Sequence, residues 1–258
     1  NAEHVQAEQY LSEAIDLAMA TGDEVTEATL CLAIGHAQAA RGARDLALHS
    51  LGRAEKIIQA RGDMFALAEL HKDAGLIHFM LRDYDAAVEA TEVALEIAKS
   101  YDFPYVRAVC AHNIGDVQVR RNNLAKAFTY FYSSLQICEH HSFEKLRSLN
   151  LMFVGYIDAI RLKSDAGIAQ ILDGLRYAEE KHYVWDMIQG KFLLGQALYE
   201  LNRLSDAKKA LEEAVSLGRT TGNRVYVDEC EELLSAIAAI QLVTTGDDNA
   251  KPSEPPTG

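Results

Sequence analysis

The stretch LAIGHAQAARGARDLAL, residues Leu32–Leu48, contains the position that decides the fold. Its apolar residues recur at helical spacing, yet Gly35 stands inside the first half. A glycine inside a helix costs about 1 kcal/mol relative to alanine. A helix that keeps a glycine at such a position therefore needs a packing reason for it.

The same pattern returns four more times, as KDAGLIHFMLRDYDAAV, HNIGDVQVRRNNLAKAF, MFVGYIDAIRLKSDAGI and FLLGQALYELNRLSDAKKAL. The glycines stand 40 residues apart, and one further step falls on Ser235. These repeat glycines are Gly35, Gly75, Gly115, Gly155 and Gly195. Small residues follow each of them after twelve positions (Ala47, Ala87, Ala127, Gly167 and Ala207) and after nineteen (Ala54, Ala94, Ser134, Gly174 and Ala214). A fixed period of this length indicates a stack of supersecondary units.

Each unit is predicted to be a pair of helices, because no segment shows sustained strand alternation. Five helix glycines would together cost about 5 kcal/mol, which is comparable to the net stability of a modest domain. A missing Cβ lets two helix backbones approach closely, so we expect each repeat glycine to be a contact point between paired helices.

The predicted fold is an all-α solenoid of antiparallel helix pairs with about 12 helices. We expect one domain over residues 1–243, with five full repeats at 24–223 and a half repeat at each end. Residues 244–258 are polar and proline-rich, so we expect a disordered tail or linker there.

A small residue in the first helix, followed by alanines twelve and nineteen positions later, resembles the tetratricopeptide repeat. The resemblance covers nearly the whole chain, although the usual unit has 34 residues and ends its second helix with a proline. The longer unit is similar to the superhelical domains of bacterial signalling proteins of the maltose-regulator type. This resemblance implies a right-handed superhelix whose first helices line a concave groove.

Composition excludes some classes of partner. The formal charge of −13 and a pI of about 5.1 disfavour binding to nucleic acid or to an anionic membrane. The four cysteines lie far apart in apolar helical sequence, so we expect buried free thiols in a reducing compartment (Cys31, Cys110, Cys138 and Cys230). We therefore expect a cytoplasmic protein. The first residue is Asn1 rather than Met, so we expect a processed protein or a fragment of a larger one.

The candidate binding residues share one face of the first helices. Positions three before, one after and five after each repeat glycine are i, i+4 and i+8 of a helix, and we expect this face to look into the groove. Its candidate partner-binding residues are His36, Lys72, Leu76, His112, Asp116, Arg120, Met152, Tyr156, Phe192 and Gln196. Apolar anchors mixed with polar groups suit an extended peptide or a partner helix. Alternatively, the apolar members pack between helices, and Asp116 forms an ordinary ion pair with Arg120.

No phosphate-binding loop, HExxH motif or nucleophile elbow is present, so we expect no enzyme activity, no cofactor and no metal site. The predicted function is a protein-interaction or regulatory scaffold, acting in bacterial signalling. The alternative is a receptor for a small peptide or metabolite that regulates an attached or partner effector domain. The first helix has no preceding partner, so Leu11 and Ile15 are expected to leave a flank for upstream sequence or for a second copy of the chain in a homo-oligomer.

Overall fold

The computed structural model describes the backbone of residues 2–248 and the side chains of residues 9–242. Within the described residues all regular structure is helical, which confirms the all-α prediction. The twelve helices there are α1 (Ala2–Thr21), α2 (Glu24–Ala40), α3 (Arg44–Arg61), α4 (Met64–Met80), α5 (Tyr84–Ser100), α6 (Pro104–Arg120), α7 (Leu124–His141), α8 (Glu144–Leu162), α9 (Asp165–Glu180), α10 (Val184–Glu200), α11 (Leu204–Thr221) and α12 (Val227–Asp248).

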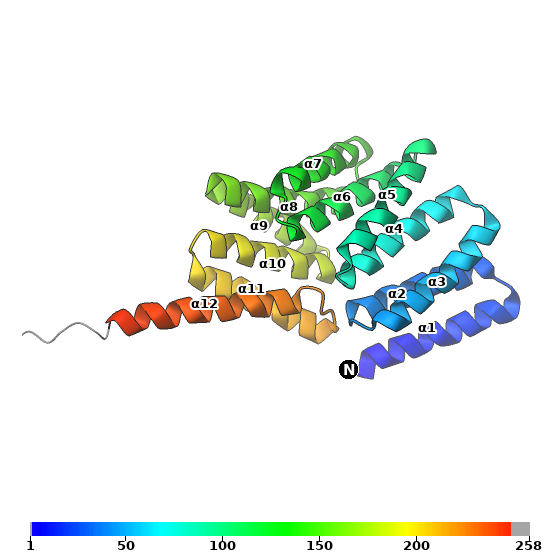
Figure 1. Cartoon of the computed structure of the whole chain (residues 1–258), viewed down its shortest axis with the longest axis horizontal. Coiled ribbons are helices and arrows are strands. Elements are labelled where there is room, and N and C mark those ends of the chain that lie inside the picture. The colour runs from blue at the N-terminus through cyan, green and yellow to red at the C-terminus, as the bar shows by residue number, and fades with distance from the viewer. Residues whose placement is uncertain (1, 249–258) are drawn as a thin grey trace, which may run out of the picture.

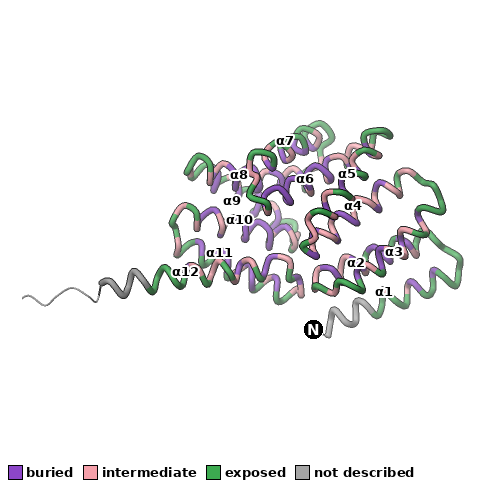
Figure 2. The backbone as a smooth tube through the Cα atoms, in the orientation of Figure 1, coloured by how far each residue is buried: buried purple, intermediate pink, exposed green. Residues whose placement is uncertain are grey.

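The helices pair in sequence as five hairpins: α2/α3, α4/α5, α6/α7, α8/α9 and α10/α11. Each hairpin packs against the next, and α1 and α12 cover the two ends of the stack. The hairpins follow one another around an arc that brings the start of α12 back beside α2 (Figure 1). Buried residues form stripes along the helix faces that meet inside this stack (Figure 2).

Each repeat glycine lies where the two helices of its hairpin touch. A Cβ on Gly155 would stand 2.6 Å from the carbonyl oxygen of Gly167, twelve residues later. The equivalent distances are 3.1 Å from Gly75 to Ala87 and 3.4 Å from Gly195 to Ala207. These separations leave little or no room for a side chain. The predicted contact point between paired helices is therefore confirmed, and the recurring small residues are its two sides.

Gly115 meets a side chain instead of a backbone. A Cβ there would stand 2.8 Å from the ring of Phe131, which lies over the glycine. Phe131 in turn stacks on Phe153 of the next repeat, with 4.5 Å between ring centroids. The missing side chain at Gly115 therefore makes the space for an aromatic layer that joins two repeats.

The turns between helices are spaced by about half the repeat. Each contains one residue with a left-handed backbone, glycine in four cases (Gly22, Gly42, Gly62 and Gly222). Seven other turns place a non-glycine residue in the same conformation (Arg82, Asp102, Asn122, Ser142, Lys163, His182 and Asn202). Lys163 comes one residue late because α8 is longer than the other first helices. The left-handed residue lets each helix reverse direction within a short connection.

Two expectations about the ends need correction. Helix α12 continues to Asp248, five residues beyond its expected end, and the rest of the expected tail, residues 249–258, lies outside the described residues. On α1, Ile15 is buried in a cluster with Ala28 and Cys31 of α2, and Leu11 is half-buried. The two residues expected to be exposed thus lie on the side of α1 that packs on α2. The exposed apolar side chains of α1 are Tyr10, Leu17 and Met19.

The four cysteines are free and buried, as predicted. Burial raises the pKa of Cys110 to about 12 and that of Cys138 to about 11, so both stay protonated thiols at neutral pH. No helix among the described residues is both long enough and apolar enough to cross a membrane.

The close contact at Gly155 gives a prediction with a built-in control. Replacing Gly155 with alanine should lower the free energy of unfolding by about 1–3 kcal/mol, because the added methyl group collides with the backbone of α9. Gly52 lies within α3, and a methyl group added there would have no neighbour within 4 Å, so Gly52→Ala should raise stability by up to about 1 kcal/mol. Urea unfolding of both variants measures the difference, and an equal gain at both sites would contradict the contact.

A second prediction concerns the turns. His182 has φ of 55°, a conformation that costs a residue with a side chain about 1–2 kcal/mol. His182→Gly should therefore raise the free energy of unfolding by about 1 kcal/mol. Lys181, the preceding residue, has an ordinary right-handed backbone, so Lys181→Gly should lower it by about 0.5–1 kcal/mol. Opposite shifts in melting temperature are expected, and a loss at both positions would refute this account of the turns.

Candidate partner-binding cavity

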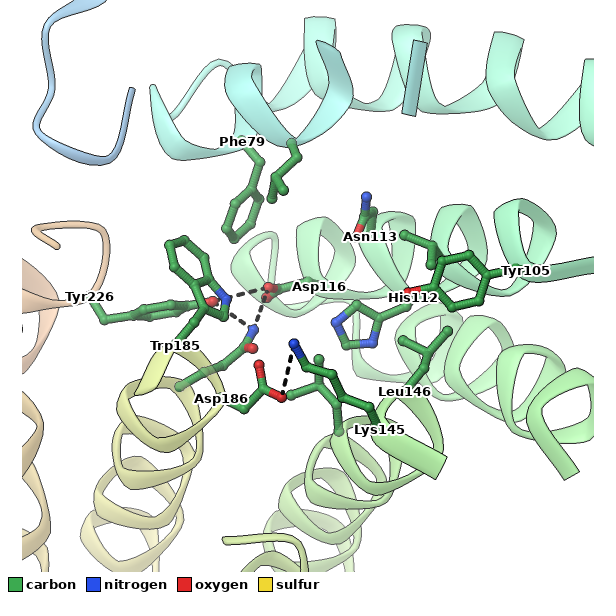
Figure 3. Close-up of a pocket in the computed structure, with 14 residues that line it drawn as sticks. Phe79, Tyr105, His112, Asn113, Asp116, Lys145, Leu146, Trp185, Asp186 and Tyr226 are labelled. Atoms are coloured by element: carbon green, nitrogen blue, oxygen red, sulfur yellow. Dashed lines mark hydrogen bonds and ion pairs between the residues drawn. The ribbon is translucent and has the colours of Figure 1, made fainter. Parts of the chain in front are cut away.

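A cavity of about 210 Å³ lies on the inner face of the arc, where side chains from four repeats and from Tyr226 converge (Figure 3). Helices α4, α6, α8 and α10 form its walls, and Tyr226, just before α12, contributes to its floor. The lining residues are Leu76, Phe79, Tyr105, Val109, His112, Asn113, Asp116, Lys145, Leu146, Leu149, Trp185, Asp186, Gln189 and Tyr226.

The lining residues follow the helical period along each wall. On α6 they include Tyr105, Val109, His112 and Asp116, spaced by three or four residues on one face. The neighbouring helices contribute the same repeat positions. Lys145 lies 40 residues after Tyr105, and Trp185 lies 40 residues after Lys145. The cavity is therefore a direct product of the repeat, built from equivalent positions of consecutive units.

A network of buried polar groups forms the floor. The Gln189 amide donates hydrogen bonds from Nε2 to Asp116 Oδ2 at 3.0 Å and to the Tyr226 hydroxyl at 2.6 Å. Tyr226 donates to the same Asp116 oxygen at 3.3 Å. On the other side of the carboxylate, Arg120 Nε lies 3.6 Å from Asp116 Oδ1, and Arg120 also pairs with Glu229 of α12. One buried arginine therefore joins a carboxylate of α6, in the middle of the stack, to one of α12, at its end.

The Arg120 guanidinium is also enclosed by aromatic rings. Its central carbon lies 5.5 Å from the ring centroid of Phe79, 5.0 Å from that of Phe192 and 4.7 Å from that of Tyr226. Such cation–π contacts are favourable, and more so when the cation is desolvated. Only 8% of the Arg120 side chain is exposed, so the group is held as a structural cation inside the arc.

Burial shifts the titration of the groups around this arginine. It raises the pKa of Asp116, and the nearby Arg120 guanidinium opposes that shift. Burial also raises the pKa of the Tyr226 phenol well above its ordinary range, so the hydroxyl keeps its proton and donates. The pKa of Asp186, at the cavity wall, is raised by burial as well, and Lys145 opposes the rise.

The start of α12 closes one end of the cavity. The backbone N–H of Arg224 donates to the carbonyl oxygen of Ala40 at 3.0 Å, which joins the last repeat to the first. Arg82 lies 3.5 Å from Asp228 and 3.9 Å from Glu229, and Val225 packs against the apolar cluster of Phe79. We call residues 224–229 the closing segment, because it bridges the ends of the arc.

The structure places three of the ten predicted residues at this cavity: Leu76, His112 and Asp116. Arg120 lies beneath them in the floor, where it forms the ion pair with Asp116 that the alternative interpretation described. The closing segment covers the positions five residues after each glycine in this part of the arc. The groove face therefore shifts toward the N-terminal half of each first helix.

The prediction was wrong for three residues, which lie in the core instead of the groove: Met152, Tyr156 and Phe192. Met152 is 1% exposed and fills the space left by Gly174 and Gly190 on neighbouring helices. The later repeats pack so closely that this position is covered by the next first helix. Gln196 is half-buried, and its Oε1 has no hydrogen-bond partner.

His36 and Lys72 lie elsewhere on the inner face. His36 lines a second cavity of about 480 Å³ between α2 and α4, and its Nε2 lies 3.9 Å from Asp73. Lys72 pairs with Glu69 at 2.6 Å and Asp73 at 3.3 Å, two carboxylates that line the same cavity. These two predicted residues therefore belong to the first two repeats rather than to the central cavity.

Several cavity residues lie outside the face predicted from the sequence. They include Tyr105, Lys145, Trp185, Asp186 and Gln189, all in the N-terminal half of a first helix. A signal for them exists, because they stand ten, nine or six positions before a repeat glycine and share a helix face with His112 and Asp116. Extending the predicted face backwards by two turns would have found them.

Comparison with known proteins supports the repeat architecture. Residues 188–219, most of α10 and α11, match the family model of the tetratricopeptide repeat. No curated protein matches the chain in sequence at a significant level.

Solved structures similar to the chain share its fold at low identity. A signal transduction ATPase with numerous domains and a tetratricopeptide repeat sensor, from Pyrococcus horikoshii, is 14% identical with a TM-score of 0.58, over 92% of this chain and 36% of that one. A Rap protein complexed with competence and sporulation factor is 14% identical with a TM-score of 0.64, over 92% and 70%. BtubC from P. vanneervenii is 14% identical with a TM-score of 0.59, over 99% and 94%. The chain thus spans about a third of the length of the first of these proteins.

The buried Arg120 gives the prediction for this site. Arg120→Met should lower the free energy of unfolding by about 3–5 kcal/mol, because it leaves the buried Asp116 without its cation and removes one of the two cations beside the half-buried Glu229. Arg176→Met is the matched control, since Arg176 pairs with Asp173 on the exposed face of α9 and such pairs contribute about 0–1 kcal/mol. Chemical denaturation of both variants tests this, and similar losses would show that the buried network adds little.

Proposed function

We propose that this chain, whose residues 188–219 match the tetratricopeptide repeat model, acts as a regulatory interaction module that binds an extended segment of a partner protein in its central cavity. The observation that carries the proposal is the convergence of side chains from four repeats and from Tyr226 at one point on the inner face (Figure 3). Such a point is a concave, mostly apolar site with a few polar groups, which is the usual form of a ligand site.

The size of the cavity favours an anchoring side chain over a whole small molecule. Its volume of about 210 Å³ lies below the range of about 300–1,000 Å³ that is usual for drug-sized ligands. One or two side chains of a longer ligand fit this space. The rest of the ligand then lies across the surface around the mouth.

An aromatic rim next to the cavity offers that surface. We define the aromatic rim as Phe65, Tyr101, Phe103, Tyr105 and Phe143, at the turns into α4, α6 and α8. Phe65 meets Phe103 edge to face at 5.1 Å between centroids, and Tyr105 meets Phe143 at the same distance. Aromatic residues are enriched where proteins bind partners, because they bury a large area at a low entropic cost.

The rim also connects the two inner cavities. Phe65 lines the cavity between α2 and α4, and Tyr105 lines the central one. An extended peptide that follows the inner face therefore has aromatic side chains to contact between two recesses. A similar fold occurs in a Rap protein complexed with competence and sporulation factor and in the sensor-bearing signalling ATPase, which supports a role in signalling.

A second candidate function is a receptor whose ligand tightens the arc. The closing segment favours it, because Tyr226 belongs both to the cavity floor and to the contact between the ends. A ligand in the cavity would then stabilise the closed form and present it to an effector domain or partner. Small-angle X-ray scattering with and without ligand separates this candidate from a rigid scaffold, for which the radius of gyration does not change.

The proposed function predicts a specific loss of partner binding. Trp185→Ala removes a half-buried wall of the cavity and should weaken binding at least tenfold, measured by calorimetry with a partner recovered from cells. Tyr132→Ala is the control, because Tyr132 is exposed on α7 and stacks on Phe128 away from the cavity. Circular dichroism checks that both variants fold. Loss of binding in Tyr132→Ala with full binding in Trp185→Ala would move the site to the outer face.

A further inference from the structure

We infer that the central cavity recognises a cationic side chain, a lysine ammonium or an arginine guanidinium, carried by the bound peptide. The inference deepens the proposed function and rests on it. It follows from the acceptors without a donor that the cavity presents.

His112 supplies the first acceptor. Asn150 donates from its amide nitrogen to Ser134 Oγ at 2.8 Å and to the Leu146 carbonyl oxygen at 2.9 Å, so its Oδ1 must be the atom that lies 3.0 Å from His112 Nδ1. A carbonyl oxygen only accepts, and Nδ1 therefore carries the proton. Burial lowers the pKa of His112, which keeps the ring neutral. The other ring nitrogen, Nε2, then carries a lone pair, and His112 is one of the residues that line the cavity.

The floor supplies one more acceptor. Gln189 uses its Nε2 for Asp116 and Tyr226, and its Oε1 is buried without a hydrogen-bond partner. The Asp116 carboxylate beside it adds negative charge to the floor, and its Oδ1 lies on the side of Arg120, 3.6 Å from Nε. Both side chains are more than nine-tenths buried. Unpaired buried acceptors are costly, and a ligand with several donors relieves that cost.

Asp186 supplies a carboxylate at the wall. Its side chain is 6% exposed, and the nearest cation is the Lys145 ammonium at 3.8 Å, too far for a hydrogen bond. Figure 3 shows Asp116, His112, Lys145 and Asp186 directed toward the same space. An anionic ligand would meet two carboxylates there, whereas a cation with three or more N–H groups finds a partner for each.

Lys145 occupies the place of the proposed ligand and can leave it. Its side chain is 53% exposed, and its ammonium also lies 4.5 Å from the ring centroid of Tyr183. An incoming cation that pairs with Asp186 leaves Lys145 over the Tyr183 ring, outside the cavity. Among the described residues that line the cavity, Lys145 is the one lysine or arginine. The next cation, Arg120, lies beneath the floor and pairs there with Asp116 and Glu229.

The apolar walls fit the stem of such a side chain. Leu76, Val109 and Leu149 line the cavity together with the rings of Phe79 and Trp185. Lysine and arginine side chains bury their methylene groups along apolar surface, and their charged ends are attracted to aromatic faces. The formal charge of −13 on the whole chain further favours the approach of a cationic peptide.

Selection of random peptides displayed on phage against the full chain tests the inference. We expect lysine or arginine at one position in most selected peptides, and replacement of that residue with norleucine should weaken binding at least tenfold. Asp186→Asn should weaken binding of the selected peptide by a similar factor. Lys145→Gln should strengthen it several-fold, because it removes the competing ammonium, and its exposed position keeps the fold intact.

The control for general charge attraction is Asp173→Asn. It removes one negative charge from the exposed face of α9, away from the cavity, and should change peptide affinity less than twofold. An equal loss in Asp173→Asn and Asp186→Asn would overturn specific recognition of the cation.

The remaining outcomes separate this inference from the proposed function. Selected peptides without a basic residue that still require Trp185 would overturn cation recognition and leave the peptide-binding function standing. Binding of spermidine at the cavity, with no peptide selected, would support cation recognition and overturn the proposed peptide-binding function. Weaker binding in Lys145→Gln would show that Lys145 is a ligand contact and would refute the exchange proposed here.

Discussion

The close approach of two helix backbones within each hairpin is the constraint on which the rest of this structure depends. It requires a residue without a side chain at one point of the first helix and a small residue opposite, as at Gly155 and Gly167. Because the contact recurs every 40 residues, the hairpins stack with the same geometry and bring equivalent positions to the inner face. The cavity walls on α6, α8 and α10 are a consequence of that regularity.

The repeat made most of the fold predictable from the sequence. Glycine spacing located all five hairpins, because it is a local feature that recurs. Two features could not be predicted from the repeat, for physical reasons. The extra length of α8 shifts the following left-handed residue to Lys163, and no local sequence pattern indicates that shift. The end of α12 was misjudged because polar residues near a chain end are compatible with either helix or coil.

The candidate site was only partly predictable. Helical geometry correctly grouped Leu76, His112 and Asp116 on one face, but it could not say which turns of that face stay open. That depends on contacts between residues far apart in sequence. Arg224 reaches Ala40, and Glu229 reaches Arg120, so the closing segment covers the C-terminal turns of the first helices. Met152 and Phe192 were misplaced for a related reason, since the curvature of the later repeats buries them.

The closing segment also distinguishes this protein from a linear repeat array. A linear array can gain or lose a unit at modest cost, because each unit contacts only its neighbours. Here the first and last units touch, so a duplication or deletion of one hairpin would carry residues 224–229 past their docking point at Ala40 and Arg82. The number of repeats is therefore fixed by the circumference that must be spanned. Unlike an open solenoid, this protein has a geometric reason to keep its length through evolution.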